Sequence, residues 1–447
     1  MISKMLAEFV SNTAYEDIPA GALHAARRCL LDWLGCAIGG SRARSSSAFS
    51  SALAGERGLP ECTIVGAGHR TSLLAASMIN AAFAHALELD DLHRGSIYHP
   101  GAPVVSAALA VAEKEDARLS DLLRAIVLGY ETSIRVGECV TPSHYRYWHT
   151  TGTVGAFGSA VAAAVLLGLD RDQIVWALGN AGTQAAGLWE FIRDGSMSKT
   201  LHCAKAACNG VLAAALAREG FTGPASIFEG DQGFCRAMAE EFDLAKITEE
   251  LGLAYRIQDI AFKVHASCGH THSAIDAVLA MRQSGRIGLD TVEKLTVHTY
   301  PTAIKVAGDP CPRDGYAAKF SIAYCVAVAL KHGDVGLGRF DQAVLDDSDI
   351  QRIMGLTELV VDDRLAAMYP RRFPARVVAQ TTGGDRVNWE VMTPRGEPPE
   401  DLTDNELAAK FAGVAGEVIG KDHARRACRE ILTGDPSMPV RKLTEQL

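Results

Sequence analysis

The sequence predicts a mainly α-helical protein built from a large all-helical bundle domain and a smaller α+β domain. From residue 1 to about 265, segments rich in Ala, Leu and Val follow one another at helical spacing. After about residue 290, hydrophobic and polar residues alternate with a period of two, as in half-buried strands. The chain of 447 residues is also longer than one ordinary hydrophobic core accommodates, which favours more than one domain.

The first domain is predicted to be a bundle of long helices. We expect helices over residues 20–39, 73–89, 101–115, 119–140, 152–167 and 204–218. Many of these segments are rich in Ala and Gly, which permits close helix contact in a bundle core. Asp170 and Gln173 have the spacing of a helix N-terminal cap, so a further helix is predicted to run to Gly179. Gly168 is predicted to end the helix before it.

The second domain is predicted to mix strands with helices. Strands are expected over 293–300, 358–362, 375–381 and 386–391, with a hairpin turn at 382–385, and helices over about 267–284, 317–331 and 341–354. A linker rich in Pro and acidic residues at 393–400 leads to a helical C-terminal segment that we expect to return to the first domain. The predicted division is therefore 1–265 with 400–447 for the all-helical domain and 266–399 for the α+β domain.

The composition excludes several classes of function. The net charge is −9 and no basic stripe offsets it, which argues against a nucleic-acid partner. The longest apolar runs are too short to span a membrane, and the N-terminus lacks the features of a secretory signal, so we expect a cytoplasmic protein. The eleven cysteines form no CxxC pairs, which favours reduced, buried thiols over a disulfide framework.

Two histidines stand in segments typical of an active site. His149 precedes Thr150-Thr151-Gly152-Thr153, and His99 precedes Pro100-Gly101, so each lies in a loop or at a helix start. Imidazoles titrate near neutrality and are the usual proton carriers in enzymes. We therefore predict both as acid–base groups; the alternative for each is a structural, hydrogen-bonded histidine.

Several cations are candidates for holding an anion. Lys199, His202 and Lys205 recur at spacings of three on an otherwise apolar helix, which favours an anionic ligand over a solvated stripe. Lys263 stands where the helical texture gives way to the second domain, and its amine would bind a carboxylate or act as a base. Arg146 offers a planar fork for a carboxylate.

Four further residues are weaker candidates. Tyr145 is a phenolic proton carrier by type, although its aromatic neighbours are equally consistent with packing. Lys319 and Tyr324 lie about one helical turn apart and would reach a cleft from the second domain; Tyr324 equally suits the core. Cys268 has Lys263 close in sequence, and a basic neighbour lowers the pKa of a thiol, so Cys268 is a candidate proton donor or acceptor.

Two groups of residues have the side chains that metal ions bind, which leaves a metal-dependent hydrolase as an alternative. They are Asp90, Asp91, His93 and His99 in the first group, and His265, His270 and His272 in the second. Neither group has the spacing of a recognised metal motif. The glycine series at 152, 155 and 158 follows no predicted strand, which excludes a dinucleotide-binding loop.

Several stretches together resemble the MmgE/PrpD family. They are residues 85–93, 99–101, 149–158, 195–210, 220–224, 263–272 and 318–324. The resemblance runs from about residue 5 to about residue 440. Described members include 2-methylcitrate dehydratase, cis-aconitate decarboxylase and iminodisuccinate epimerase, which share chemistry at a carbon next to a carboxylate.

The resemblance implies a large helical domain interrupted by a smaller α+β domain, with the site between them and usually a homodimer. It also implies a site without metal or cofactor, in which acids such as Asp91 order neighbouring cations and loops. Glu88 stands where cis-aconitate decarboxylases carry a site aspartate. Cys268 stands where they carry a catalytic histidine and where iminodisuccinate epimerase has cysteine, which weakens assignment as a decarboxylase.

The sequence thus predicts a cofactor-independent enzyme that acts on a small polycarboxylate. The predicted catalytic residues are His99, His149, Lys199, Lys263, Cys268 and Tyr145. The predicted substrate-binding residues are Glu88, Asp91, Arg146, His202, Lys319 and Tyr324. Dehydration of a 2-methylcitrate-like acid is the favoured reaction, before epimerisation of an imino- or amino-dicarboxylate and then decarboxylation. A non-catalytic helical binding protein is the alternative from another class.

Overall fold

The computed structural model describes residues 1–53 and 58–445 and divides into two compact units. The first unit consists of Met1–Ile260 and Thr403–Leu447, and the second of Ala261–Leu402. The chain therefore leaves the first unit once and returns to it through its C-terminal helices. No helix among the described residues is long and apolar enough to cross a membrane.

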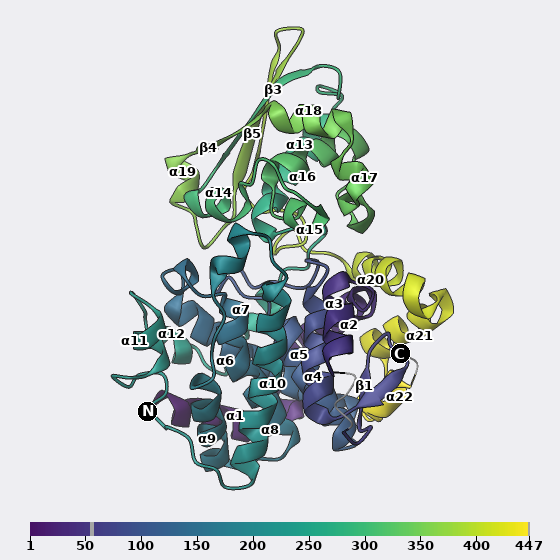
Figure 1. Ribbon diagram of the computed structural model, residues 1–447. Coiled ribbons are helices and arrows are strands. Elements are labelled where there is room, and N and C mark those ends of the chain that lie inside the picture. The colour runs from purple at the N-terminus through teal and green to yellow at the C-terminus, as the bar shows by residue number, and fades with distance from the viewer. Residues whose placement is uncertain (54–57, 446–447) are drawn as a thin grey trace. The chain divides into compact units, whose positions relative to one another are not determined.

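The first unit is a cluster of helices with one short β-hairpin (Figure 1). Its helices of ten or more residues are α1 (Ile2–Asn12), α2 (Ala20–Gly40), α3 (Arg44–Leu53), α4 (Leu73–His85), α5 (Gly101–Lys114), α6 (Leu119–Val140), α8 (Gly155–Leu166), α9 (Arg171–Gly182), α10 (Ser198–Arg218), α20 (Asp404–Ile419) and α21 (Lys421–Thr433). The shorter ones include α7 (Thr150–Thr153), α11 (Phe234–Met238), α12 (Ala245–Thr248) and α22 (Val440–Thr444), and the hairpin pairs β1 (Cys62–Ile64) with β2 (His69–Thr71).

Helix α10 lies at the centre of this unit and packs against α4, α5, α8 and α9. Small residues make this crowding feasible. At Gly210, an added Cβ would lie 2.4 Å from the Cβ of Ser159 on α8, so a larger residue would push the two helices apart. Lys199 and Thr200, near the start of α10, are thereby held inside the helical core.

The predicted helices of the first unit are present, with differences at their ends. The segment predicted as one helix over 73–89 ends at His85, because Glu88 adopts a left-handed φ of 55° that an α-helix does not tolerate. The segment predicted over 152–167 is two helices, α7 and α8, and α10 begins six residues before its predicted start. The hairpin of β1 and β2 was not predicted, since its strands have only three residues each.

The predicted cap of α9 offers a direct test of local stability. The Asp170 side chain accepts a hydrogen bond from the Gln173 backbone N–H at 2.9 Å, and the Gln173 side chain accepts one from the Asp170 N–H in return. We expect Asp170→Ala to lower the free energy of unfolding by about 1 kcal/mol. Urea unfolding checks this, with Asp172→Ala as the control, because Asp172 lies in the same turn. Equal losses in the two variants would contradict a capping role.

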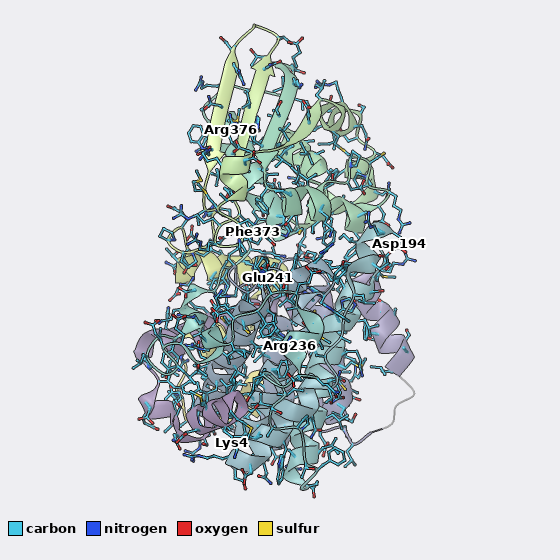
Figure 2. All side chains as sticks on the ribbon, turned by 90° about the vertical axis from the view of Figure 1, so that its left-hand side faces the viewer. Lys4, Asp194, Arg236, Glu241, Phe373 and Arg376 are labelled. Carbon is cyan, nitrogen blue, oxygen red and sulfur yellow. The ribbon has the colours of Figure 1, made fainter. Side chains whose placement is uncertain are left out.

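The second unit packs helices against a four-stranded sheet. The strand order is β4 (Thr357–Val361), β3 (Val292–Thr299), β5 (Ala375–Thr381), β6 (Arg386–Val391), with β3 and β4 parallel and the other pairs antiparallel. Helix α13 (His272–Gln283) packs against β5 and β6 and against α16 (Ile322–His332). Arg376, labelled in Figure 2, lies on β5 and pairs with Asp362 at 3.2 Å. The remaining helices are α14 (Pro301–Ala307), α15 (Gly315–Ala318), α17 (Gln342–Leu345), α18 (Ser348–Gly355) and α19 (Asp363–Ala366).

The strands of this unit agree with the prediction to within one residue, whereas its helices differ. The helix predicted over 267–284 begins at His272, after a single turn of 3₁₀-helix at Gly269–Thr271. The helix predicted over 341–354 is two helices, because the Asp347 side chain caps a new helix at Ser348. The cap at Asp347 therefore divides a segment that was predicted as a single helix.

Candidate active site

Two histidines and an aspartate meet where α4 ends. The Nδ1 atom of His85 lies 2.6 Å from Oδ2 of Asp90, and both side chains are buried. The same oxygen lies 3.6 Å from Nδ1 of His99. His99 also donates from Nδ1 to the backbone carbonyl of Asp91 at 2.7 Å. This bond places the proton of a neutral His99 on Nδ1 and leaves its Nε2 as an acceptor.

A third histidine, His149, adjoins the first two. It precedes α7, and its ring stacks on that of His85 with the centroids 5.7 Å apart. Its Nδ1 lies 3.2 Å from Nδ1 of His202 on α10, and the indole of Trp189 meets its ring edge at 5.0 Å. Among the described residues, the buried Nε2 atoms of His85 and His149 have no hydrogen-bond partner. These two nitrogens are available to a ligand.

A buried ion pair adjoins the histidines. Lys199, three residues before His202 on α10, places its Nζ 2.5 Å from Oε1 of Glu88, and both side chains are buried. Glu88 holds its position with a left-handed φ of 55°, a conformation that costs of order 1–3 kcal/mol in a residue with a side chain. A substrate carboxylate that bound Lys199 would therefore share the ammonium with Glu88.

Burial sets the charge of the histidines. The pKa of His149 lies well below its usual value because the ring is buried, and Lys199, His202 and His85 lower it further by electrostatic repulsion. Burial, with His85 and Lys199, lowers the pKa of His202 to about 4. Both rings are therefore neutral at pH 7, and a neutral imidazole both accepts and donates a proton.

His85, Asp90 and His99 are also the one group of described residues whose possible metal-ligand atoms lie within 4.8 Å of one another. Ligand atoms at about 2.0–2.1 Å from a tetrahedral zinc ion are roughly 3.3 Å apart. The 2.6 Å between His85 and Asp90 is shorter and is a hydrogen-bond distance. The geometry therefore fits a shared proton better than a metal ion.

Asp91 supports the loop that carries His99. Its Oδ2 accepts a hydrogen bond from the hydroxyl of Tyr130 at 2.8 Å, and its Oδ1 accepts one from the N–H of Gly101 at 2.9 Å. Burial, with Asp32 and Asp90, raises the pKa of Asp91 well above its usual range. Both oxygens have partners inside the unit, so we reassign Asp91 from substrate contact to support of this loop.

A pocket of about 630 Å³ adjoins the histidines through His202, which lines it together with Lys205 from the same helix. Trp148, Leu188 and Phe191 supply apolar surface. The acidic Glu190 and Asp194 also line it, and Asp194 is labelled in Figure 2. The predicted cationic face of α10 is thus divided: Lys199 is paired in the core, whereas His202 and Lys205 line a pocket of mixed charge.

His144 supports the same region and gives a pH-dependent test. Its Nε2 lies 2.7 Å from Oγ1 of Thr153 on α7, and burial lowers its pKa to about 4 from an ordinary value of 6.5. Between these values the unfolded chain binds a proton that the folded chain does not, so this histidine destabilises the fold as the pH falls. His144→Gln should gain about 2–3 kcal/mol of unfolding free energy relative to wild type between about pH 7 and pH 4.

Denaturant titrations of both proteins across that pH range measure the gain. The exposed His69 is the matched control, since His69→Gln should leave the pH dependence as in wild type. A constant difference between His144→Gln and wild type at all pH values would contradict a neutral, buried His144.

Two other predicted residues of this unit lie in different settings. The ring of Tyr145 meets Trp189 edge-on at 4.8 Å and so belongs to the aromatic group beside His149. Arg146 instead pairs with Glu240 at 3.0 Å, and more than half of its side chain is exposed. Its planar fork thus binds a carboxylate of the protein itself, which weakens the prediction that it holds substrate.

The second unit places Lys319 against the buried segment that carries two other predicted residues, Lys263 and Cys268. Lys263 and Cys268 are both buried, and the Cys268 N–H donates to the carbonyl of Lys319 at 2.9 Å. The Lys319 ammonium donates to the carbonyl of Ala266 at 2.8 Å and lies 4.5 Å from the ring centroid of Phe340. Lys319 therefore braces the segment that carries Lys263 and Cys268.

The remaining predictions in this unit are corrected. Tyr324 donates from its hydroxyl to the carbonyl of Arg339, and burial raises its pKa, so it is a core residue of α16. The three histidines considered as a zinc cluster each have a separate partner. These are Asp276 for His265 at 2.8 Å, Tyr300 for His270 at 2.7 Å and the Ser267 carbonyl for His272 at 3.3 Å.

Sequence reasoning missed two members of the site, His85 and Asp90, as proton-handling residues. His85 ends an apolar helix, and its partner Asp90 follows five residues later, a spacing that neither a helix nor a strand brings together. The turn at Glu88 makes the contact, and the positive φ of that residue was not legible in the sequence.

The fold and this cluster define a mainly helical protein with a group of histidines at the end of α4. The chain belongs to the MmgE/PrpD family: the family model of the MmgE/PrpD N-terminal domain matches residues 4–246, and that of the C-terminal domain matches residues 265–433. Together the two models cover most of the chain, which establishes the resemblance seen in the sequence.

Curated relatives share most of their length with this chain. A cis-aconitate decarboxylase-like protein of Aspergillus oryzae is 28% identical, with 99% of this chain and 96% of the relative aligned. A cis-aconitate decarboxylase of Aspergillus terreus is 26% identical over 100% of this chain and 96% of its own. The human cis-aconitate decarboxylase is 24% identical over 64% of this chain and 60% of its own.

Proposed function

We propose that this protein is a lyase that transfers a proton at a carbon next to a carboxylate of a small di- or tricarboxylate, without a metal or cofactor. The observation that carries the proposal is the cluster of the buried His85, His99 and His149 with the half-buried His202, beside the Glu88–Lys199 pair. The family, whose curated relatives include cis-aconitate decarboxylases, supports the substrate class.

The cluster has the parts that this chemistry requires. Removing a proton next to a carboxylate needs a base, and the Nε2 atoms of His85 and His149 have no hydrogen-bond partner among the described residues. The enolate-like dianion that forms needs positive charge nearby, which Lys199 supplies while Glu88 holds it in place. The apolar, buried surroundings strengthen both interactions.

Dehydration of a 2-methylcitrate-like hydroxy acid is the reaction we place first. The C–H bond next to the carboxylate breaks, its electron pair forms a C=C bond, and the hydroxyl leaves as water after taking a proton. This elimination needs a base and an acid, and the cluster offers several imidazoles for the two tasks.

Decarboxylation of cis-aconitate is the second candidate, which the names and coverage of the relatives favour. Here the carboxylate leaves as CO₂ and an acid returns a proton to the carbon. Epimerisation of an imino- or amino-dicarboxylate is the third. It needs two proton carriers on opposite faces of one carbon, such as Tyr145 or Cys268 against a lysine or a histidine.

Proton NMR of the purified protein with 2-methylcitrate, citrate, cis-aconitate and iminodisuccinate stereoisomers separates these reactions. A new vinyl signal, or a new signal of a methyl group on a double bond, from a hydroxy acid supports dehydration. Loss of cis-aconitate with release of CO₂ supports decarboxylation, and a new stereoisomer alone supports epimerisation. An unchanged spectrum with every acid would contradict the proposed function. The proposal includes a cytoplasmic homodimer, for which light scattering of the purified protein provides the test of assembly.

A further inference from the structure

We propose that His85, oriented by Asp90, is the general base of this site and thus a further catalytic residue. The inference deepens the proposed function and rests on it. The sequence predicted His99 and His149 as the acid–base residues. The inference instead assigns the proton-accepting step to His85.

The first argument is the tautomer of His85. With Asp90 ionised, the 2.6 Å contact places the proton of a neutral ring on Nδ1 and leaves the lone pair on Nε2. That Nε2 is buried and has no partner among the described residues. When it takes a proton, the Asp90 carboxylate stabilises the imidazolium through a charge-assisted hydrogen bond.

The second argument is comparison with the other histidines of the cluster. His99 donates from Nδ1 to the neutral carbonyl of Asp91 at 2.7 Å and lies 3.6 Å from the Asp90 carboxylate. His149 faces His202 through Nδ1, and each ring disfavours a positive charge on the other. Within this cluster, therefore, His85 has the closest contact with a carboxylate.

The third argument is position. The His85 ring stacks on His149 at 5.7 Å and meets the edge of His99 at 4.9 Å. Because the two buried rings stack, a ligand that contacts one ring lies close to the other. In a dehydration, His85 Nε2 takes the proton from carbon and the electron pair forms the double bond. The His85 imidazolium then returns this proton to the departing hydroxyl, which leaves as water while the neutral His149 donates a hydrogen bond to it.

The test is chemical rescue of His85→Ala with azoles of one size and different basicity. Turnover of the acid that wild type converts should fall roughly 10²–10⁴-fold in the variant. Added imidazole should restore it more than 1,2,4-triazole, which fills the same space but is a weaker base. Equal rescue by imidazole and 1,2,4-triazole would overturn the proposal. It would show that the added ring restores activity by filling the cavity and not by accepting a proton.

Asp90→Asn provides a second measurement that needs no substrate. With histidine labelled by ¹⁵N, NMR should show His85 in the Nδ1–H form in wild type and a mixture of tautomers in the variant. An Nε2–H tautomer in wild type would overturn the proposal even if no acid is turned over. Asp404→Asn is the matched control, because Asp404 lies 3.3 Å from His24 outside the cluster, at a half-exposed position. If NMR shows the expected tautomer of His85 but wild type converts none of the acids, the result would contradict only the proposed function.

Discussion

Replacing His149 by glutamine is expected to lower kcat/KM by roughly 10²–10⁴-fold, the contribution typical of an acid–base residue. Glutamine keeps a polar group toward His202 but cannot accept and release a proton. The ring is buried and its Nε2 has no partner among the described residues, so its loss removes a reactive atom and leaves the surrounding helices in place. Initial rates with the acid that wild type converts provide the measurement.

The control for this variant is His423→Gln, at an exposed position on α21. We expect wild-type rates from it. Circular dichroism and the unfolding midpoint of His149→Gln should match those of wild type. A His149→Gln protein that is folded and retains full activity would show that His149 is a packing residue.

Removing one partner of the Glu88–Lys199 pair is expected to cost roughly 3–5 kcal/mol of unfolding free energy. Both groups are buried and their charged atoms lie 2.5 Å apart, so either single substitution leaves a charge without its partner in a low-dielectric core. Lys199→Met and Glu88→Gln should each be strongly destabilised. The double variant, which carries no net charge at this position, should be more stable than the sum of the single losses predicts.

Denaturant unfolding of the two single variants and the double variant completes this thermodynamic cycle. The surface pair of Arg146 and Glu240 is the matched control, because its side chains are more than half exposed and solvent screens their attraction. Arg146→Met should therefore cause a much smaller loss. Additive losses in the Glu88–Lys199 cycle would contradict a coupled buried pair.

Much of the fold followed from local patterns in the sequence. The helix over residues 119–140 was predicted to the residue, because it is rich in hydrophobic residues and no proline interrupts it. The strands at 375–381 and 386–391 were equally clear, since hydrophobic alternation and a Gly-Gly turn specify a hairpin. The helix ends were less accurate where one residue decides, as with the left-handed Glu88 and the capping Asp347.

The sequence indicated several residues of the candidate site, but it did not indicate which of them contact one another. The spacing of Lys199 and His202 indicated that they share one side of α10, and the structure places both beside His149. Nothing local indicated that Glu88 would neutralise Lys199, because the two residues are 111 positions apart in the chain. Pairings of this kind come from tertiary packing, which a single sequence does not display.

Deuterium incorporation tests the central claim most directly. Wild-type protein is incubated in heavy water with 2-methylcitrate and, separately, with cis-aconitate, and NMR follows deuterium at each carbon of substrate and product. In wild type we expect the carbon next to a carboxylate to lose its proton on dehydration, or to gain deuterium in the recovered acid or the decarboxylation product. Both His149→Gln and His85→Ala should lose this activity. Turnover in which that carbon neither loses its proton nor gains deuterium, or equal results for wild type and both variants, would contradict proton transfer by the histidine cluster.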